Sequence, residues 1–232
     1  MVKLADQSKI LQLTDVGFSY QSGEFRLNIP ELSVKAGEKV AVIGPSGSGK
    51  TTLLNLVAGI LVPDSGSVIV DGEKINKQTD RFRRDFRISS IGFVLQDFGL
   101  IDYLNVRDNI VHPYRISNAL KLNEEVRDRA RQLAEEIGVG DKLDRHPADL
   151  SHGERQRVAI CRALLPTPKL ILADEATGNL DPDNKTHIIE LLFQAVSEHD
   201  ATLLAVTHDQ ELLHHFDRII NFGDFISGGP DE

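Results

Sequence analysis

Apolar residues fall into short runs along this chain, and polar or glycine-rich segments separate the runs. Three continuous runs are typical of parallel strands buried on both faces: "KVAVIG" at 39–44, "KLILADE" at 169–175 and "TLLAVTH" at 202–208. "LQLTDVGFSY" at 11–20 alternates instead, which predicts an antiparallel strand with one solvated face. Shorter strands are predicted in "GSVIVDG" at 66–72 and in "ISSIGFVLQD" at 88–97, the latter ending near Gln96.

Helical spacing of apolar residues fills most of the remaining chain. It predicts helices after Lys50, from Asn123 to Ile137, after Ser151, and from Pro182 to about His199. Strands that alternate with helices indicate an α/β fold with a mostly parallel sheet. The helical stretch at about 97–150 is interpreted as an insertion into that core.

Composition narrows the classes of function. The 232 residues suit one large α/β domain, and no apolar stretch approaches the roughly 20 residues of a membrane helix. A net charge of −9 disfavours non-specific nucleic-acid binding, so we expect no nucleic-acid partner. The basic stretch from Arg81 to Arg87 is interpreted as a solvated helix face. The single cysteine, Cys161, excludes a disulfide within the chain and lies in a helical apolar pattern, so we expect a buried thiol.

The stretch "GPSGSGKT" at 44–51 predicts a phosphate-binding loop, because it follows an apolar strand and precedes the helical "TTLLNLVAGI". Its glycines let successive backbone N–H groups turn inward, and the helix N-terminus adds partial positive charge. Lys50 can reach the β- and γ-phosphates, and the Thr51 hydroxyl can bind Mg²⁺. The predicted nucleotide-binding residues are Gly44, Pro45, Ser46, Gly47, Ser48, Gly49, Lys50, Thr51 and Thr52.

Acidic residues and a histidine follow two of the buried strands. Asp174 and Glu175 end "LILADE", where ligands gather at the carboxyl ends of parallel strands. We assign Asp174 to Mg²⁺ and Glu175 to the general base, with a solvated acidic pair as the alternative. His208 ends another strand and is predicted to hydrogen-bond the γ-phosphate and the attacking water. A histidine of the surface or core is the alternative there.

The segment "LSHGERQR" at 150–157 places Ser151 three residues before Glu154 and ahead of an apolar helical pattern. On its own this spacing predicts a capping box at a helix start. Together with the loop, Gln96, "LILADE", "NLD" at 179–181 and His208, it resembles the ATP-binding subunit of an ABC transporter. The resemblance covers nearly the whole chain, in the family's order.

The resemblance implies a P-loop ATPase of a single domain over 1–232, in which ATP and Mg²⁺ bind. A nucleotide-binding core, at about 10–96 and 151–225, would carry a mostly parallel sheet and an antiparallel β subdomain. A helical subdomain would occupy about 97–150. The resemblance further implies that Tyr20 stacks on adenine, with Phe18 as the alternative, that Gln96 senses Mg²⁺ and the attacking water, and that Asp181 organises a dimer contact.

The resemblance also gives the Ser151 helix a ligand: the ATP held by a second ATPase subunit. Ser151, Gly153 and Glu154 would meet that nucleotide, so each reaction centre would need two chains. Three residues depart from the family pattern. His152 stands where Gly is usual, Glu154 where Gln is more frequent, and Ala176 where Pro is commoner. None of these departures removes Ser151 or Gly153, so we expect the site to survive.

Two segments, at 94–110 and 172–181, resemble a subgroup that includes ATPases of lipoprotein-release, macrolide-export and cell-division complexes. This implies a permease partner, a homodimer in preference to a heterodimer, and a place at the cytoplasmic face of the membrane. The function implied is ATP-driven export or extraction. A mechanotransmitting ATPase that moves no solute is the alternative. Four apolar residues of the loop at 97–103 either pack in the helical lobe or line a groove for the permease: Phe98, Leu100, Ile101 and Tyr103.

Overall fold

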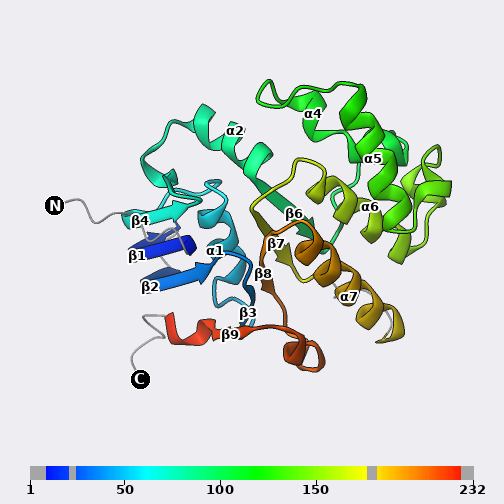
Figure 1. The fold of residues 1–232 in the computed structure, drawn as a ribbon. Helices are drawn as coiled ribbons and strands as arrows, with labels where there is room; N and C mark the ends of the chain where they lie inside the picture. Colours follow the sequence, from blue (N-terminus) through cyan, green and yellow to red (C-terminus); the bar gives the residue numbers. More distant parts are fainter. Residues whose placement is uncertain (1–8, 21–24, 177–181, 226–232) are drawn as a thin grey trace.

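The chain folds around two sheets, and the computed structural model describes residues 9–20, 25–176 and 182–225 (Figure 1). A parallel sheet has the strand order β6-β7-β8-β3-β9. Its strands are β3 (Lys39–Ile43), β6 (Ile91–Leu95), β7 (Leu170–Asp174), β8 (Thr202–Val206) and β9 (Arg218–Asn221). An antiparallel sheet has the order β2-β1-β4-β5. Its strands are β1 (Lys9–Ser19), β2 (Arg26–Lys35), β4 (Ser65–Val70) and β5 (Glu73–Lys74).

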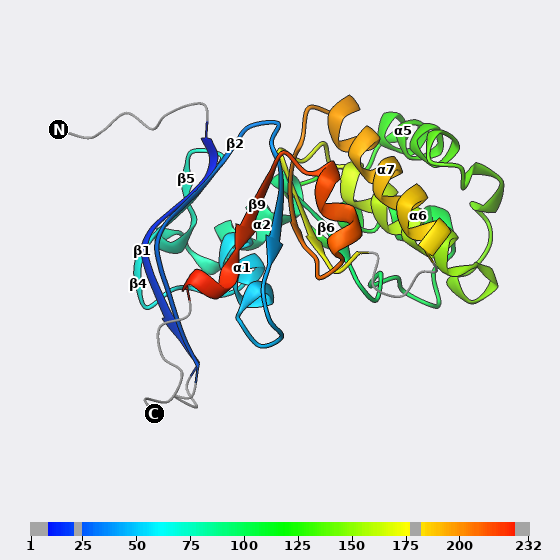
Figure 2. The same ribbon diagram turned by 90° about the horizontal axis from the view of Figure 1, so that it is seen from below.

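The parallel sheet lies between two layers, as Figure 2 shows. Alternating side chains of β7 divide between two apolar cores, because successive residues of a strand point to opposite faces. Leu170 and Leu172 pack with α1 (Lys50–Val57) and the antiparallel sheet. Ile171 and Ala173 pack with the helices of the other face, which include α6 (His152–Leu164) and α7 (Pro182–Glu198). Both faces of the sheet are therefore covered, which explains its continuous apolar runs.

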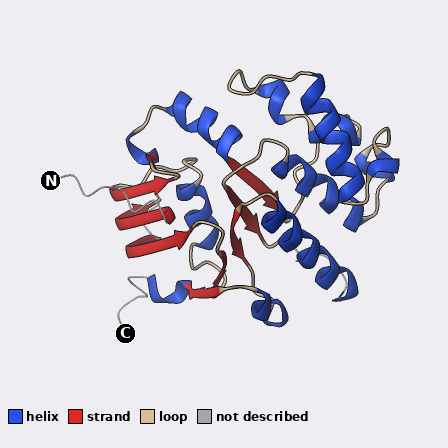
Figure 3. Cartoon of the chain, in the orientation of Figure 1, coloured by secondary structure: helices blue, strands red, loops and turns tan. Residues whose placement is uncertain are grey.

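A helical lobe continues the second layer (Figure 3). It contains α3 (Val106–Ile110), α4 (Pro113–Ile116) and α5 (Glu124–Glu136), and α3 and α5 pack on α6. Buried Asn109 organises the loop before it, accepting from Ile101 N at 2.7 Å and donating to three backbone carbonyls. Short 3₁₀ turns complete the fold at Ile75–Lys77, Gly140–Lys142, Pro147–Asp149, Gln210–His215 and Phe222–Phe225. No helix among the described residues is long and apolar enough to cross a bilayer.

The structure shifts the predicted strand boundaries by one to three residues. The strand predicted at 88–97 begins at Ile91, because α2 (Asp80–Ser90) occupies its first three positions. Thr79 caps α2 by accepting from Phe82 N, and Ile91 N still donates to the carbonyl of Arg87. The basic stretch 81–87 lies on this helix, but it is only partly the solvated face that the sequence predicted: the Arg83 side chain is 15% exposed, and Arg87 donates to the carbonyl of Ala58. The Cys161 thiol is buried on α6, as expected.

Candidate nucleotide-binding site

The phosphate loop connects β3 to α1 at the carboxyl end of the parallel sheet. Gly47 and Gly49 have φ of +78° and +92°, a region that glycine enters without a steric penalty. Gly49 is also the N-cap of α1, and a Cβ there would lie 2.5 Å from the Phe25 ring. Both the backbone and the close ring therefore require glycine. Buried Ser48 Oγ beside Gly44 has no hydrogen-bond partner among the described residues, which leaves a donor for an anion.

Lys50 begins α1 and is only 8% exposed. Its Nζ donates to the carbonyl oxygens of Gly44 and Pro45, both at 2.9 Å. The ammonium is thus held inside the loop, close to the backbone that would bind a phosphate. A desolvated cation at a helix N-terminus attracts anions strongly, because little water screens either charge.

Asp174 ends β7, and β8 lies between β7 and β3 in the sheet. The Thr51 hydroxyl donates to its Oδ2 at 3.1 Å. Burial raises the pKa of the Asp174 carboxyl, and the charge of Glu175 adds to this, whereas Thr51 and Lys50 oppose it. A hydroxyl and a carboxylate at this distance are the hard oxygen ligands that Mg²⁺ prefers, so the residues present fit this ion.

Glu175 leaves the strand in a left-handed conformation, with φ of +46°. Its N–H donates to the carbonyl of Val206 at 3.0 Å, which fixes the turn against β8. Its Oε1 lies 3.3 Å from His208 Nδ1, at the end of that neighbouring strand. Two predicted residues from distant parts of the sequence therefore meet, and they do so beside the phosphate loop.

Most of these groups line one cleft of about 520 Å³, although Ser48 and Asp174 are not among its described lining residues. Its described lining residues are Tyr20, Phe25, Gly44, Ser46, Gly47, Gly49, Lys50, Thr51, Thr52, Glu175, Val206 and His208. Tyr20 lies at the cleft with 42% of its surface exposed, and its hydroxyl is 3.1 Å from Thr52 Oγ1. Phe18 is buried behind it, with the two ring centroids 4.9 Å apart, so Tyr20 is the better placed of the two predicted aromatics.

The Ser151 segment forms the predicted capping box. Ser151 Oγ accepts from Glu154 N at 3.3 Å, and Glu154 Oε2 accepts from Ser151 N at 2.8 Å. The Ser151 N–H bond is the main cause that lowers the pKa of the Glu154 carboxyl. A Cβ on Gly153 would meet no atom within 4 Å, so this helix start is open. No residue from 151–154 is among the described residues that line the cleft.

Two other predicted residues stand apart from the cleft. Gln96 is exposed in the turn after β6, and it is not among the described lining residues. Asp181 lies outside the described residues.

Three residues near the site carry no sequence prediction: Phe25, Gln156 and Arg162. Gln156 is fully buried on α6, and its Nε2 donates to the carbonyl of Ala176, directly after Glu175. Its place four residues before Ile160, on the apolar stripe, was an available signal for a buried polar group. Arg162 donates to the carbonyls of Phe98 and Gly99. Phe25 follows a segment outside the described residues, and its sequence context gave no signal.

A second, larger cleft of about 970 Å³ lies between α2, β6 and the α3–α4 segment. Its lining mixes exposed apolar residues, such as Ile60 and Ile116, with arginines of α2 and α6. The loop residues predicted as a groove are not part of this described lining. Phe98 is buried, Leu100 packs on the helical core, and Tyr103 is 81% exposed. Of the segment 97–103, only Gly99 reaches the described wall of this cleft.

A glycine loop, a buried lysine and a helix N-terminus, with a carboxylate at the end of a nearby strand, define a P-loop nucleotide-binding protein. Residues 27–178 match the family model described as ABC transporter, and the chain belongs to this family. It is an ATPase of that family and binds ATP.

Known relatives include ATP-binding proteins of transport systems. The chain is 41% identical over 194 residues to LolD 2, a lipoprotein-releasing system ATP-binding protein of Caulobacter vibrioides, with 84% of each protein covered. It is 40% identical over 218 residues to MacB, a macrolide export ATP-binding/permease protein of Rhodopirellula baltica, covering 93% of this chain and 32% of MacB. A solved dimer of the ATP-binding cassette MJ0796, in a post-hydrolysis state bound to ADP and Pi, matches with a TM-score of 0.78 at 35% identity, covering 91% of this chain and 93% of that one.

Proposed function

We propose that this chain is the ATP-hydrolysing subunit of a membrane transport complex that exports or extracts its substrate. Two copies would close on two ATP molecules, and closure would move a permease. Similarity to LolD 2 and MacB supports a lipoprotein or a drug-like molecule as the substrate class. The permease would hold the two copies at the cytoplasmic face of the membrane.

The observation that carries this proposal is the separation of the Ser151 edge from the chain's own cleft. Ser151 and Gly153 offer an open helix start, yet no described residue of that segment lines the cleft that holds Lys50 and Glu175. A helix N-terminus is an anion site, so it would serve a phosphate bound elsewhere. The dimer of the similar cassette supports a second copy as the source of that phosphate.

The roles within the cleft follow from the contacts. Lys50 would exchange its two carbonyl partners for phosphate oxygens, which supply more negative charge. Thr51 and Asp174 would hold Mg²⁺, which supplies charge stabilisation for the phosphates when bound. Tyr20, with its ring exposed at the cleft, would stack on adenine. Gln96 and Asp181 keep their expected roles as part of this proposal.

Hydrolysis would run through Glu175. Its carboxylate would accept a proton from water as the water oxygen bonds to the γ-phosphorus and the bond to the ADP oxygen breaks. His208 Nδ1, 3.3 Å from Glu175 Oε1, would orient that carboxylate and the γ-phosphate. Gln156 would hold the Ala176 carbonyl and thereby fix the strained turn at Glu175.

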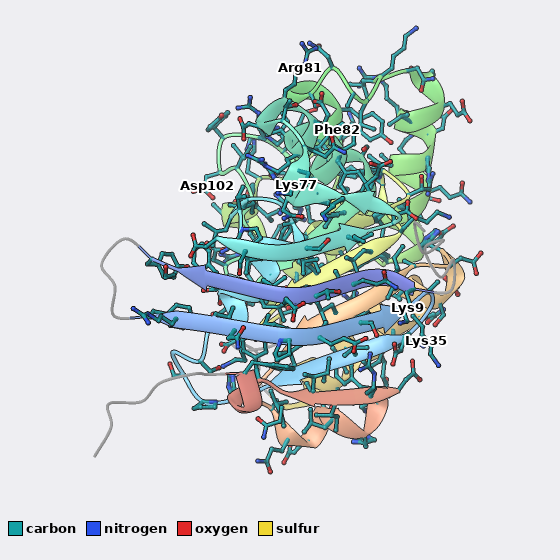
Figure 4. The ribbon with its side chains drawn as sticks, turned by 90° about the vertical axis from the view of Figure 1, so that its left-hand side faces the viewer. Lys9, Lys35, Lys77, Arg81, Phe82 and Asp102 are labelled. Atoms are coloured by element: carbon teal, nitrogen blue, oxygen red, sulfur yellow. The ribbon has the colours of Figure 1, made fainter. Side chains whose placement is uncertain are left out.

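The larger cleft would receive a short amphipathic helix of the permease that carries acidic side chains. Four arginines line it, Arg81, Arg84, Arg87 and Arg162, against one carboxylate, Asp85, in a chain whose net charge is −9. Figure 4 shows Arg81 and Phe82 on the outer side of α2, above the antiparallel sheet. This local excess of cations beside exposed Ile60 and Ile116 supports an occupant that is both acidic and apolar.

Replacing Ser151 with a bulky residue tests the shared site. In a Glu175→Gln background that retains ATP, we expect the parent chain to dimerise on ATP, and Ser151→Trp to stay monomeric by light scattering. ATP binding by the Ser151→Trp monomer should persist, because the phosphate loop is intact. A Ser151→Trp chain that dimerises with unchanged dependence on ATP would remove the Ser151 edge from the site.

A further inference from the structure

His152 is the first residue of α6 and follows the Ser151 cap directly. Its ring meets the Phe98 ring edge to face, with centroids 4.9 Å apart. No role assigned above uses this ring, although it stands between the Ser151 edge and the turn that carries Gln96. The contact therefore joins two parts of the proposed machinery that act on different nucleotides.

Phe98 closes that turn in an unusual conformation. Its φ is +62°, which is sparsely populated for a bulky residue, so its surroundings must hold it. Its N–H donates to the carbonyl of Leu95 at 3.0 Å, with Gln96 and Asp97 between them. Although only 5% exposed, Phe98 is in neither of the two core clusters that the described residues form. The His152 ring is thus an important part of its local packing.

Helix α6 contacts the turn at a second point. The Arg162 guanidinium, ten residues after His152, donates to the carbonyls of Phe98 and Gly99. Arg162 fixes the backbone of the turn, and His152 meets its side chain beside the Ser151 cap. A shift of the α6 start relative to the turn would therefore break the ring contact first, because the two Arg162 bonds lie nearly three helical turns away.

We propose that His152 is a positioning residue that links the two nucleotide sites of the dimer. Its ring, seated on Phe98, sets the turn carrying Gln96 relative to the Ser151 edge. ATP held against Ser151 by the partner would then favour the position of Gln96 that its proposed role at the chain's own nucleotide requires, and the reverse by linkage. The inference rests on the proposed function, because it requires the Ser151 edge to serve the partner's nucleotide.

A double-mutant cycle at His152 and Phe98 measures this link. The quantity is the ATP concentration that gives half-maximal dimer, by light scattering in the Glu175→Gln background. An aromatic pair contributes on the order of two- to tenfold to an equilibrium constant, so His152→Ala and Phe98→Leu should each raise that concentration by about this factor. The double variant should be no worse than the larger single effect, and His152→Phe should restore the parent value.

Controls separate a link from a loss of structure. ATP affinity of the monomer, measured in a Ser151→Trp background, should be unchanged by His152→Ala. His152 is exposed, so His152→Ala and His152→Phe leave the core intact. If Phe98→Leu does not fold, the comparison of these two His152 variants is sufficient to test the positioning role. In hydrolysing protein, His152→Ala should also lower the Hill coefficient of turnover against ATP, which a purely structural role would not move.

Each failure has a distinct signature. Additive effects in the cycle, or equal midpoints for His152→Ala and His152→Phe, would overturn the positioning role while Ser151→Trp still blocks dimerisation. Dimerisation by Ser151→Trp would instead overturn the proposed function on which this inference rests.

Discussion

Two neighbouring carboxylates at the end of β7 face different partners. Asp174 contacts Thr51 of the phosphate loop, whereas Glu175 contacts His208, which follows the neighbouring strand β8. The left-handed φ of Glu175 produces this divergence, because it turns the chain immediately after the strand. A strand that simply continued would also alternate the two side chains, but it would not bring the second one back to the cleft.

Removing the charge of Glu175 without changing its shape tests its role in catalysis. We expect Glu175→Gln to bind ATP and dimerise, while turnover falls by about 10²- to 10⁴-fold, because a positioned general base contributes that much. Phosphate release gives turnover, and light scattering gives the dimer. Glu211→Gln, on an exposed 3₁₀ turn of the same chain, is the matched control and should turn over normally. Undiminished phosphate release by Glu175→Gln would assign the base elsewhere.

At the scale of elements, the sequence patterns predicted the strands whose burial gives them a regular arrangement of apolar residues. The strands β3, β7 and β8 are continuous apolar runs because helices and a second sheet cover both faces. The pattern missed β2, whose "RLNIPELSVK" includes Asn28 and Pro30. Because β2 is an edge strand, the missing N–H of Pro30 costs no ladder bond on its open side. The short strand β9, at an edge of the parallel sheet, also gave no clear sequence signal.

In the site, too, some features could be predicted from the sequence and others could not. The residues around Lys50 and Asp174 were predictable, because loop chemistry and a strand end fix them locally. The contacts of Gln156 with Ala176, and of His152 with Phe98, depend on how α6 packs against two distant loops. Such contacts follow from tertiary packing, and spacing along one chain does not encode them.

An ion pair ties the edge of the parallel sheet to the turn before β3. Arg218 of β9 donates to both Glu38 oxygens, at 2.6 and 3.2 Å, and to the Ser33 carbonyl. Burial acts to raise the pKa of Glu38, but the Arg218 bond, the Lys35 N–H and their charges outweigh it and lower the pKa. The contribution to stability is therefore present above the unfolded-state pKa, and it is lost as pH falls through the folded-state pKa.

Glu38→Gln measures this pair. At pH 7 we expect the variant to lose about 1 kcal/mol of unfolding free energy, a modest value because the Arg218 side chain is 41% exposed. Urea titrations across pH should show a constant difference at neutral pH that shrinks once pH drops below the usual 4.5 of a glutamate. A difference that stays constant through that acid range would exclude the carboxylate charge as its origin.

Across the whole molecule, charge is unevenly placed. The chain carries −9 overall, yet the cleft between α2 and the helical lobe gathers four arginines around one aspartate. The arginine-lined cleft reaches the turn after β6 that carries Gln96, because Leu95 and Gly99 are part of its lining. An occupant of the arginine-lined cleft would thus touch the same turn that the His152 ring holds.

Reversing two charges of α2 tests whether this cleft couples hydrolysis to the permease. Arg81 and Arg84 are 84% and 63% exposed, so Arg81→Glu/Arg84→Glu leaves both cores intact. Turnover of the isolated chain should stay within about twofold of the parent, because neither residue touches the nucleotide cleft. Stimulation by the permease should fall by about tenfold or more, since like charges across an interface repel. Arg127→Glu/Arg131→Glu is the matched control and should keep full stimulation, because these α5 side chains are 40% and 48% exposed and lie away from the described cleft lining. If basal turnover fell as much as stimulated turnover, the cleft would belong to the catalytic fold; if neither fell, the permease would bind another face.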